Sequence, residues 1–285
     1  MHLGLNTMVY EAGKVGFAEY LPKIQKFGFK YVDLNAWRSG NPTEMSTGQR
    51  KEVKKLLDGL GLVSSQLLLI NTRDMASSDA GVRASVMDYM KVCAEFQLEL
   101  GGRQVLVCWG AGVFELGIAK VRSWSHSVDA LCEYSEWCLD KGVLIEMELD
   151  PHVYFIVNSL DRMAAMLEDV DMPNLFANID VGHLHITREE PVAMEKVRGR
   201  ILHAHISETD TFEHTNSIIG TGKVDIKTYY ERLLAMGLDE DCERRGEAPV
   251  IDIEMGEPSR TVDDPDRWVS ESLRYVNRVI PQLEF

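Results

Sequence analysis

The sequence predicts a (β/α)8 barrel, and three observations lead to this fold class. Short apolar runs alternate with amphipathic segments along the whole chain of 285 residues. This alternation places one helix between successive strands, which requires a parallel sheet. The pattern repeats eight times without a long insertion, in a chain whose length suits one closed barrel of roughly 250 residues. We therefore expect a single TIM-barrel domain, residues 1–285.

Each expected strand is short and mostly apolar, as strands buried on both faces should be. The first helical pattern has Phe17, Leu21, Ile24 and Phe27 at spacings of three and four, and Gly28 is a typical helix end. The expected strands are His2–Tyr10, Tyr31–Leu34, Leu62–Ile70, Gln104–Trp109, Val143–Leu149, Leu175–Asp180, Ile201–Ile206 and Val250–Glu254. The expected helices are Phe17–Phe27, Thr47–Gly61, Ala80–Leu100, Lys120–Lys141, Asn158–Asp169, Pro191–Arg198, Asp225–Met236 and Asp266–Ile280, with an exposed loop at Asp239–Glu247.

The composition favours a soluble protein that binds a small ligand. The formal net charge is −15, and proteins that bind nucleic acid usually present a basic surface. No stretch approaches the ~20 apolar residues of a membrane span, and the N-terminus lacks the pattern of a signal peptide. The five cysteines form no CxxC pair, which favours free thiols. We expect a cytoplasmic protein that binds neither nucleic acid nor a membrane.

Ionisable residues gather at the ends of the last four expected strands, where barrel enzymes place their active sites. Glu146 and Glu148 alternate in the fifth strand and so share one face, and the seventh and eighth strands repeat this pattern. Buried carboxylates are costly unless they are paired or bind a cation. Three carboxylates and one imidazole favour Mn²⁺, Mg²⁺, Fe²⁺ or Co²⁺ over zinc with thiolates. The predicted metal ligands, nearest the open end, are Glu148, Asp180, His205 and Glu254, and the predicted supporting layer is Glu146, His203 and Asp252.

These residues resemble the sugar phosphate isomerase/epimerase superfamily of xylose isomerase-like barrels, and within it the ketose 3-epimerases of the D-tagatose and D-allulose type. The motifs GVLIEMEL, NIDVGHLH, HAHISET and VIDIEMGEP are the most specific part of a similarity that covers nearly the whole chain. The resemblance implies Mn²⁺ as the cofactor, with Mg²⁺ or Co²⁺ as alternatives, on the same four ligands. It also implies that Glu148 and Glu254 are catalytic, one removing the proton beside the carbonyl and the other returning it to the opposite face. His183 is implied as a substrate contact.

The sugar pocket departs from the family pattern. A substrate-binding glutamate of the epimerases, six residues after the first metal glutamate, is Tyr154 here, and an arginine six residues after the metal histidine is Thr211. We expect His214 and Asn216 to supply the missing polar contacts. Trp109 is expected to line the pocket, and Tyr154 with it would suit an aromatic group on the substrate.

Two classes of enzyme fit this sequence. The first is a metal-dependent isomerase or epimerase of a keto-sugar, expected as a homo-oligomer. The second is a metal-dependent lyase acting on a keto-sugar or glycoside, similar to inosose dehydratase or to the catalytic subunit of a C-glycoside deglycosylase, which works with a small second subunit. Endonuclease IV, a DNA-repair relative, needs three metals and a basic surface, which the acidic composition disfavours. A non-catalytic barrel would have no reason to keep buried carboxylates.

Overall fold

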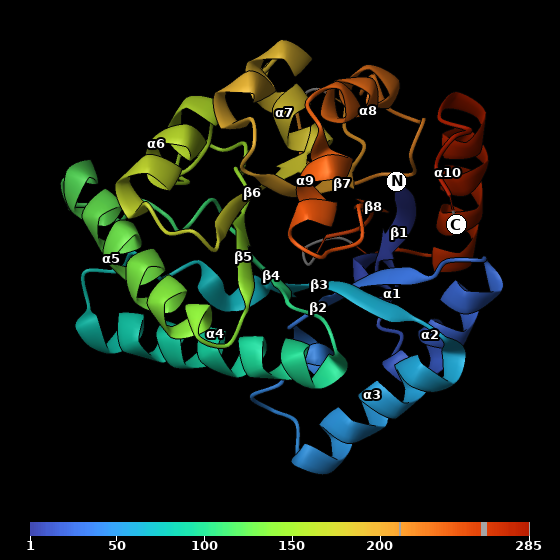
Figure 1. Cartoon of the computed structure of the whole chain (residues 1–285), viewed down its shortest axis with the longest axis horizontal. Coiled ribbons are helices and arrows are strands. Elements are labelled where there is room, and N and C mark those ends of the chain that lie inside the picture. Colours follow the sequence, from blue (N-terminus) through green and yellow to red (C-terminus); the bar gives the residue numbers. More distant parts are fainter. Residues whose placement is uncertain (211, 258–260, 285) are drawn as a thin grey trace.

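The computed structural model, which describes residues 1–210, 212–257 and 261–284, contains a closed barrel of parallel strands in the order β1 to β8. Hydrogen bonds between β1 and β8 close the ring. The barrel lies at the centre of the molecule and the long helices cover its outside (Figure 1). The predicted fold class is therefore confirmed. The strands are β1 His2–Asn6, β2 Tyr31–Asn35, β3 Val63–Leu69, β4 Gln104–Val107, β5 Leu144–Met147, β6 Leu175–Asp180, β7 Ile201–Ile206 and β8 Val250–Ile253.

The helices match the expected amphipathic segments closely, and local capping explains their ends. In α3, the Ser46 side chain accepts from the Gln49 backbone N–H while the Gln49 side chain accepts from the Ser46 N–H, and Gly61 ends the helix at φ 67°. The α-helices are α1 Met8–Ala12, α2 Phe17–Lys26, α3 Thr47–Leu60, α4 Ala80–Leu100, α5 Lys120–Leu139, α6 Leu160–Val170, α7 Val181–Thr187, α8 Ile226–Ala235, α9 Leu238–Arg244 and α10 Pro265–Val279. Short 3-10 turns are η1 Arg38–Gly40, η2 Ile70–Thr72 and η3 Pro191–Val197.

The expected strand His2–Tyr10 was too long. The Asn6 side-chain oxygen accepts a hydrogen bond from the Met8 backbone N–H at 2.9 Å, which turns the chain out of the strand. Residues Met8–Ala12 then form a short helix, all of it buried. An apolar run alone does not distinguish a buried strand from a buried helix.

Two further segments differ from the sequence expectation. The charged stretch Asp239–Glu247 is not a simple loop, because α9 occupies most of it and buries Cys242 against the barrel, with its Sγ 3.1 Å from the Leu202 carbonyl oxygen. Helix α7 was not expected. It begins at Asp180, whose side chain accepts from the His183 backbone N–H and so caps the first turn.

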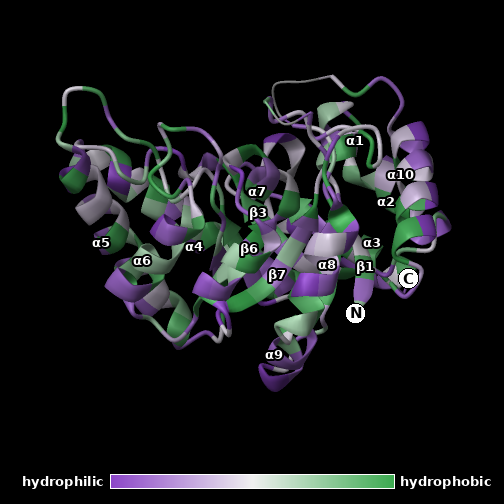
Figure 2. Ribbon diagram, turned by 90° about the horizontal axis from the view of Figure 1, so that it is seen from above, coloured by the Kyte–Doolittle hydropathy of each residue, from purple (hydrophilic) through white to green (hydrophobic). Residues whose placement is uncertain are grey.

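The strands all run in one direction, so their carboxyl ends open at one face of the barrel. In Figure 2 the N-terminus lies at one end of the barrel and the long connecting loops gather at the other. None of the helices within the described ranges is long and apolar enough to cross a membrane.

Candidate metal centre and active site

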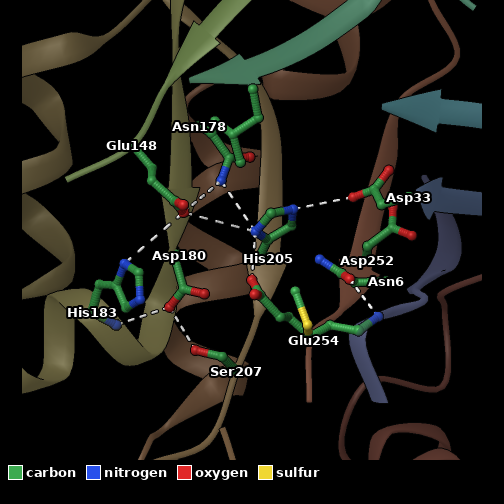
Figure 3. Close-up of polar contacts among 12 residues, drawn as sticks. Asn6, Asp33, Glu148, Asn178, Asp180, His183, His205, Ser207, Asp252 and Glu254 are labelled. Atoms are coloured by element: carbon green, nitrogen blue, oxygen red, sulfur yellow. Dashed lines mark hydrogen bonds and ion pairs between the residues drawn. The ribbon is translucent and has the colours of Figure 1, made fainter. Parts of the chain in front are cut away.

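The four predicted metal ligands lie together at the carboxyl ends of β5 to β8 (Figure 3). One ligand atom from each of Glu148, Asp180, His205 and Glu254 lies within 4.8 Å of the other three. Nδ1 of His205 is 2.8 Å from Oε2 of Glu254 and 3.9 Å from Oε2 of Glu148. The register of the strands helps to bring these residues together, because Asp180 of β6 pairs with His205 of β7.

The chemistry of this cluster fits a divalent cation. Oδ2 of Asp180 is buried and has no hydrogen-bond partner among the described residues, and Oε2 of Glu254 is ion-paired with Nδ1 of His205. Burial raises the pKa of the Glu148 carboxyl well above its usual range, and the nearby Asp150 and Glu254 carboxylates add to the rise. A cation bound among these oxygens would offset the cost of burying them. Three carboxylates and one imidazole make a hard, oxygen-rich ligand set.

Asp180 is held so that one oxygen stays available. Its Oδ1 accepts hydrogen bonds from the Ser207 hydroxyl at 2.5 Å and from the His183 backbone N–H at 2.8 Å. The Gly182 backbone N–H in turn donates to the Ser207 hydroxyl at 3.2 Å. The turn from β6 into α7 therefore leaves Oδ2 of Asp180 available as a ligand atom.

His205 is oriented by Asp33, a residue of β2. Nε2 of His205 lies 3.1 Å from Oδ2 of Asp33, which leaves Nδ1 facing the carboxylates (Figure 3). Burial by itself lowers the pKa of His205, but Glu254 and Asp33 raise it well above its usual range. A cation at Nδ1 would take the place of that proton. A carboxylate on the second nitrogen is the usual way in which proteins fix a metal-binding histidine.

Beneath the cluster, a second layer of polar residues fills the barrel. Nε2 of His203 lies 3.0 Å from Oδ2 of Asp33 and 3.2 Å from Oδ2 of Asp252. The Gln66 amide donates to Oε2 of Glu146 at 2.8 Å. The predicted supporting layer of Glu146, His203 and Asp252 is therefore present as hydrogen-bonded or ion-paired groups. Asp33, His203 and His205 also bring ligand atoms within 4.8 Å of one another, which their mutual ion pairs account for.

A pocket opens beside the metal cluster and has an empty volume of about 480 Å³, part of it open to solvent. One wall is apolar, and the other carries carboxylates and histidines. Nδ1 of His183 lies 2.7 Å from the Leu149 carbonyl oxygen, and its Nε2 lies 2.8 Å from Nε2 of His214. The lining residues are Met8, Leu68, Ile70, Cys108, Trp109, Glu148, Asp150, His183, His214, Asn216, Glu254, Gly256 and Glu257.

Four of the five predicted substrate contacts line this pocket: Trp109, His183, His214 and Asn216. Tyr154 does not line it, because its ring is turned outward, 46% exposed, and packs on Phe155 with ring centroids 4.4 Å apart. Thr211 lies outside the described residues. The substrate-binding role of each residue stays a prediction.

Sequence reasoning missed Asp33, Asn178 and Ser207. The Asn178 amide lies 3.2 Å from Nδ1 of His205 and 3.4 Å from Oε2 of Glu148, so it links two ligands. The signal for Asp33 was present, because a charged residue stands inside the apolar strand YVDLN. The same signal indicates the ionisable residues of the last four strands. Ser207 had no comparable signal.

Comparison with known proteins agrees with this architecture. A model of the xylose isomerase-like TIM-barrel family matches residues 21–277. L-ribulose 3-epimerase from Mesorhizobium japonicum is 24% identical over 245 residues, which are 84% of this chain and 79% of that protein. D-psicose 3-epimerase with D-tagatose, from Clostridium cellulolyticum H10, superposes over 100% of both chains with a TM-score of 0.78 and 18% identity.

A second solved structure, the IolI protein with a zinc atom, superposes over 99% of both chains with a TM-score of 0.78 and 18% identity. At such identities the structural likeness shows the fold alone. The family model, by contrast, spans most of the sequence. This chain belongs to the xylose isomerase-like TIM-barrel family.

Proposed function

We propose that this protein is a divalent-metal-dependent epimerase that inverts the carbon beside the carbonyl of a ketose. One observation carries the proposal. Glu148 and Glu254 both belong to the metal cluster and both line the pocket. They follow β5 and β8, which stand three places apart in a ring of eight strands. Two carboxylates can therefore reach a bound substrate from different sides.

The chemistry assigned to these residues is proton transfer. When bound, a divalent cation polarises the substrate carbonyl and stabilises the negative charge that develops on its oxygen. One glutamate, Glu148 or Glu254, removes the proton from the adjacent carbon, and the other delivers a proton to the opposite face. The low exposure of both side chains keeps bulk water from competing for that position.

The cofactor we propose is Mn²⁺, and Mg²⁺ or Co²⁺ would fit the same ligands. The oxygen-rich set of Glu148, Asp180, His205 and Glu254 supports a hard or borderline cation over a thiolate zinc site. We further propose a single domain over residues 1–285, a cytoplasmic location and a homo-oligomer. The relatives named L-ribulose 3-epimerase and D-psicose 3-epimerase support a keto-sugar as substrate.

The pocket residues would hold the sugar on both sides. His183 and His214 would offer the ring nitrogens that face each other at 2.8 Å here, and Asn216 offers a side-chain oxygen that has no partner among the described residues. Trp109 lies on the apolar wall, with its indole N–H donated to the Ile70 carbonyl oxygen. Tyr154 could reach the substrate only by turning inward from the position it occupies here.

The experiment that tests the function follows deuterium uptake at the carbon beside the carbonyl. Wild type, Glu148→Gln and Glu254→Gln are reconstituted with Mn²⁺, assayed for metal, and incubated in D₂O with L-ribulose, D-psicose and D-tagatose. Each variant should lose about 10²–10⁴-fold in turnover, the usual contribution of a general acid or base. Glu52→Gln, on the exposed side of α3, is the matched control and should keep full activity.

The two variants should differ in exchange. If the glutamates act on opposite faces, one variant still exchanges the substrate proton with solvent without completing the inversion. Near-wild-type turnover in both metal-loaded variants would refute the proton-transfer mechanism. Release of a leaving group, with only one glutamate essential, would assign the protein to the lyases instead.

A further inference from the structure

A third carboxylate in the pocket has no role in the metal cluster. Glu146, Glu148 and Asp150 occupy alternate positions along the end of β5 and the segment after it. Glu146 is bonded to Gln66 deep in the barrel, Glu148 belongs to the cluster, and Asp150 lines the pocket. Asp150 is only 5% exposed, so its carboxylate is shielded from bulk solvent.

The two oxygens of Asp150 have different environments. The Gly110 backbone N–H lies near the carboxylate, and the Val157 N–H donates to the Gly110 carbonyl oxygen at 2.8 Å, which ties the segment after β5 to the turn after β4. Oδ2 is buried and has no hydrogen-bond partner among the described residues. A buried carboxylate oxygen without a donor is unfavourable, and such atoms in native proteins usually meet a ligand or water.

The surroundings of Asp150 restrict the kind of ligand that can reach it. None of the described residues that line the pocket is a lysine or an arginine, and Glu257 adds a further carboxylate. Carboxylates accept hydrogen bonds and repel anions, so these residues favour groups that donate, such as hydroxyls. Met8, Leu68 and Ile70, which also line the pocket, offer apolar contact.

We propose that Oδ2 of Asp150 accepts a hydrogen bond from a substrate hydroxyl outside the reacting carbons, so that Asp150 selects polyhydroxy ketoses. The proposal rests on the function proposed above and extends it. Glu148, two residues earlier, belongs to the cluster where the reacting carbons would lie, and Asp150 belongs to no such group among the described residues. The hydroxyl it meets therefore lies farther along the sugar chain.

The test is a double-mutant cycle between Asp150 and the substrate hydroxyls. Asp150→Asn keeps an oxygen for the Gly110 N–H and removes the charged acceptor, whereas Asp150→Ala removes both. Wild type and both variants, loaded with Mn²⁺, are compared on a ketohexose and on its 4-, 5- and 6-deoxy analogues. The control variant is Asp88→Asn, on the exposed side of α4. The readouts are kcat, KM and calorimetric Kd.

On the parent ketohexose, Asp150→Asn should lose about 10–100-fold in kcat/KM, the value of a hydrogen bond to a charged group. For one deoxy analogue, wild type should already show this loss, and Asp150→Asn should add less than about threefold. Metal content should not change. An equal loss on all the analogues would show that Asp150 acts through the Gly110 turn, and no loss would show that Oδ2 meets only water. Either result overturns the proposal.

The same experiment separates this inference from the proposed function. If wild type binds ketoses but exchanges no proton, the proposed function is refuted. The ratio of the Kd values of wild type and Asp150→Asn for each sugar then still tests the role of Asp150. If wild type exchanges protons and Asp150→Asn behaves as wild type on every sugar, only the inference fails. If no ketose of the panel binds to the Mn²⁺-loaded protein, both fail.

Discussion

Replacing Asp33 by asparagine should weaken metal binding without removing any ligand. Oδ2 of Asp33 lies 3.1 Å from Nε2 of His205 and 3.0 Å from Nε2 of His203, and Oδ1 accepts from the Ser65 hydroxyl at 2.8 Å. An asparagine can turn its oxygen toward the histidines and its amide toward Ser65, since a hydroxyl can also accept. The substitution therefore keeps the orientation of His205 and removes the negative charge behind it.

The expected magnitude follows from that geometry. Loss of an outer carboxylate partner costs 10–100-fold in metal affinity in comparable sites, which corresponds to about 1.4–2.7 kcal/mol. Because Asn retains an acceptor for His205, we expect Asp33→Asn to weaken Mn²⁺ binding about tenfold, at the lower end of this range. Asp33→Ala, which retains no acceptor, should weaken Mn²⁺ binding by an amount near the upper end of this range.

The assay is calorimetric titration of the apo protein with Mn²⁺ after chelation with EDTA. Circular dichroism of the apo wild type should match that of the loaded protein, because the barrel core surrounds a site at its mouth. The matched control is Asp252→Asn. Asp252 contacts His203 at 3.2 Å, as Asp33 does, but makes no hydrogen bond to His205, so its metal affinity should stay within about threefold of wild type.

Two outcomes would refute this reasoning. If Asp33→Asn and Asp252→Asn weaken Mn²⁺ binding equally, the effect comes from general damage to the buried polar layer and not from His205. If Asp33→Asn binds Mn²⁺ as tightly as wild type, the charge behind His205 does not contribute to affinity. Global unfolding of the wild type on chelation would instead make the metal structural.

Two further substitutions test a support of Asp180 and the ionisation of the buried carboxyl group of Glu11. Gly182→Ala would place a Cβ 2.2 Å from the Ser207 hydroxyl oxygen and displace the hydroxyl that donates to Asp180, so Mn²⁺ binding should weaken by at least about tenfold. The control is Gly59→Ala, whose added Cβ would meet no neighbour within 4 Å. An unchanged Kd for Mn²⁺ in Gly182→Ala would contradict this reasoning. Burial raises the pKa of Glu11 to about 7 in the folded state, from 4.5, so the folded protein binds more protons between these values and loses stability as the pH rises through them. The free energy of unfolding of Glu11→Gln, relative to wild type, should therefore increase by about 2–3 kcal/mol from pH 5 to pH 8, and a constant difference in urea titrations would refute the assignment.

The fold was predictable because its signals are local and repeated. Every strand of the barrel overlaps an expected apolar run, and α4 begins and ends as predicted, at Ala80 and Leu100. The errors arose where a side chain redirected the backbone. The Asn6 amide ends β1 early, and the Asp180 carboxylate starts α7 directly after β6. Neither effect changes the hydrophobic pattern, so the pattern could not reveal it.

The clustering of the four predicted metal ligands was predictable for a different reason. A charged side chain in a strand that is buried on both faces needs a partner. Parallel strands of a barrel end at the same face, so charged residues at the ends of successive strands lie close together. This holds for Glu148, Asp180, His205 and Glu254, which all lie within one residue of a strand end. Asp33 follows the same rule from inside β2, where a charged residue stands in the apolar sequence YVDLN.

The rest of the pocket depends on the conformation of loops, which does not follow from the positions of strand ends. Residues Trp109, Gly110, Ala111 and Gly112 all have positive φ, at 62°, 52°, 54° and 102°. This turn brings the Gly110 N–H to the carboxylate of Asp150 and the Trp109 indole to the Ile70 carbonyl oxygen. The segment after β5 pairs with it, and the pairing places Asp150 inside the pocket while Tyr154 points outward. The position of the Asp150 carboxylate in the pocket is therefore a property of two loops together, and neither loop reveals it alone.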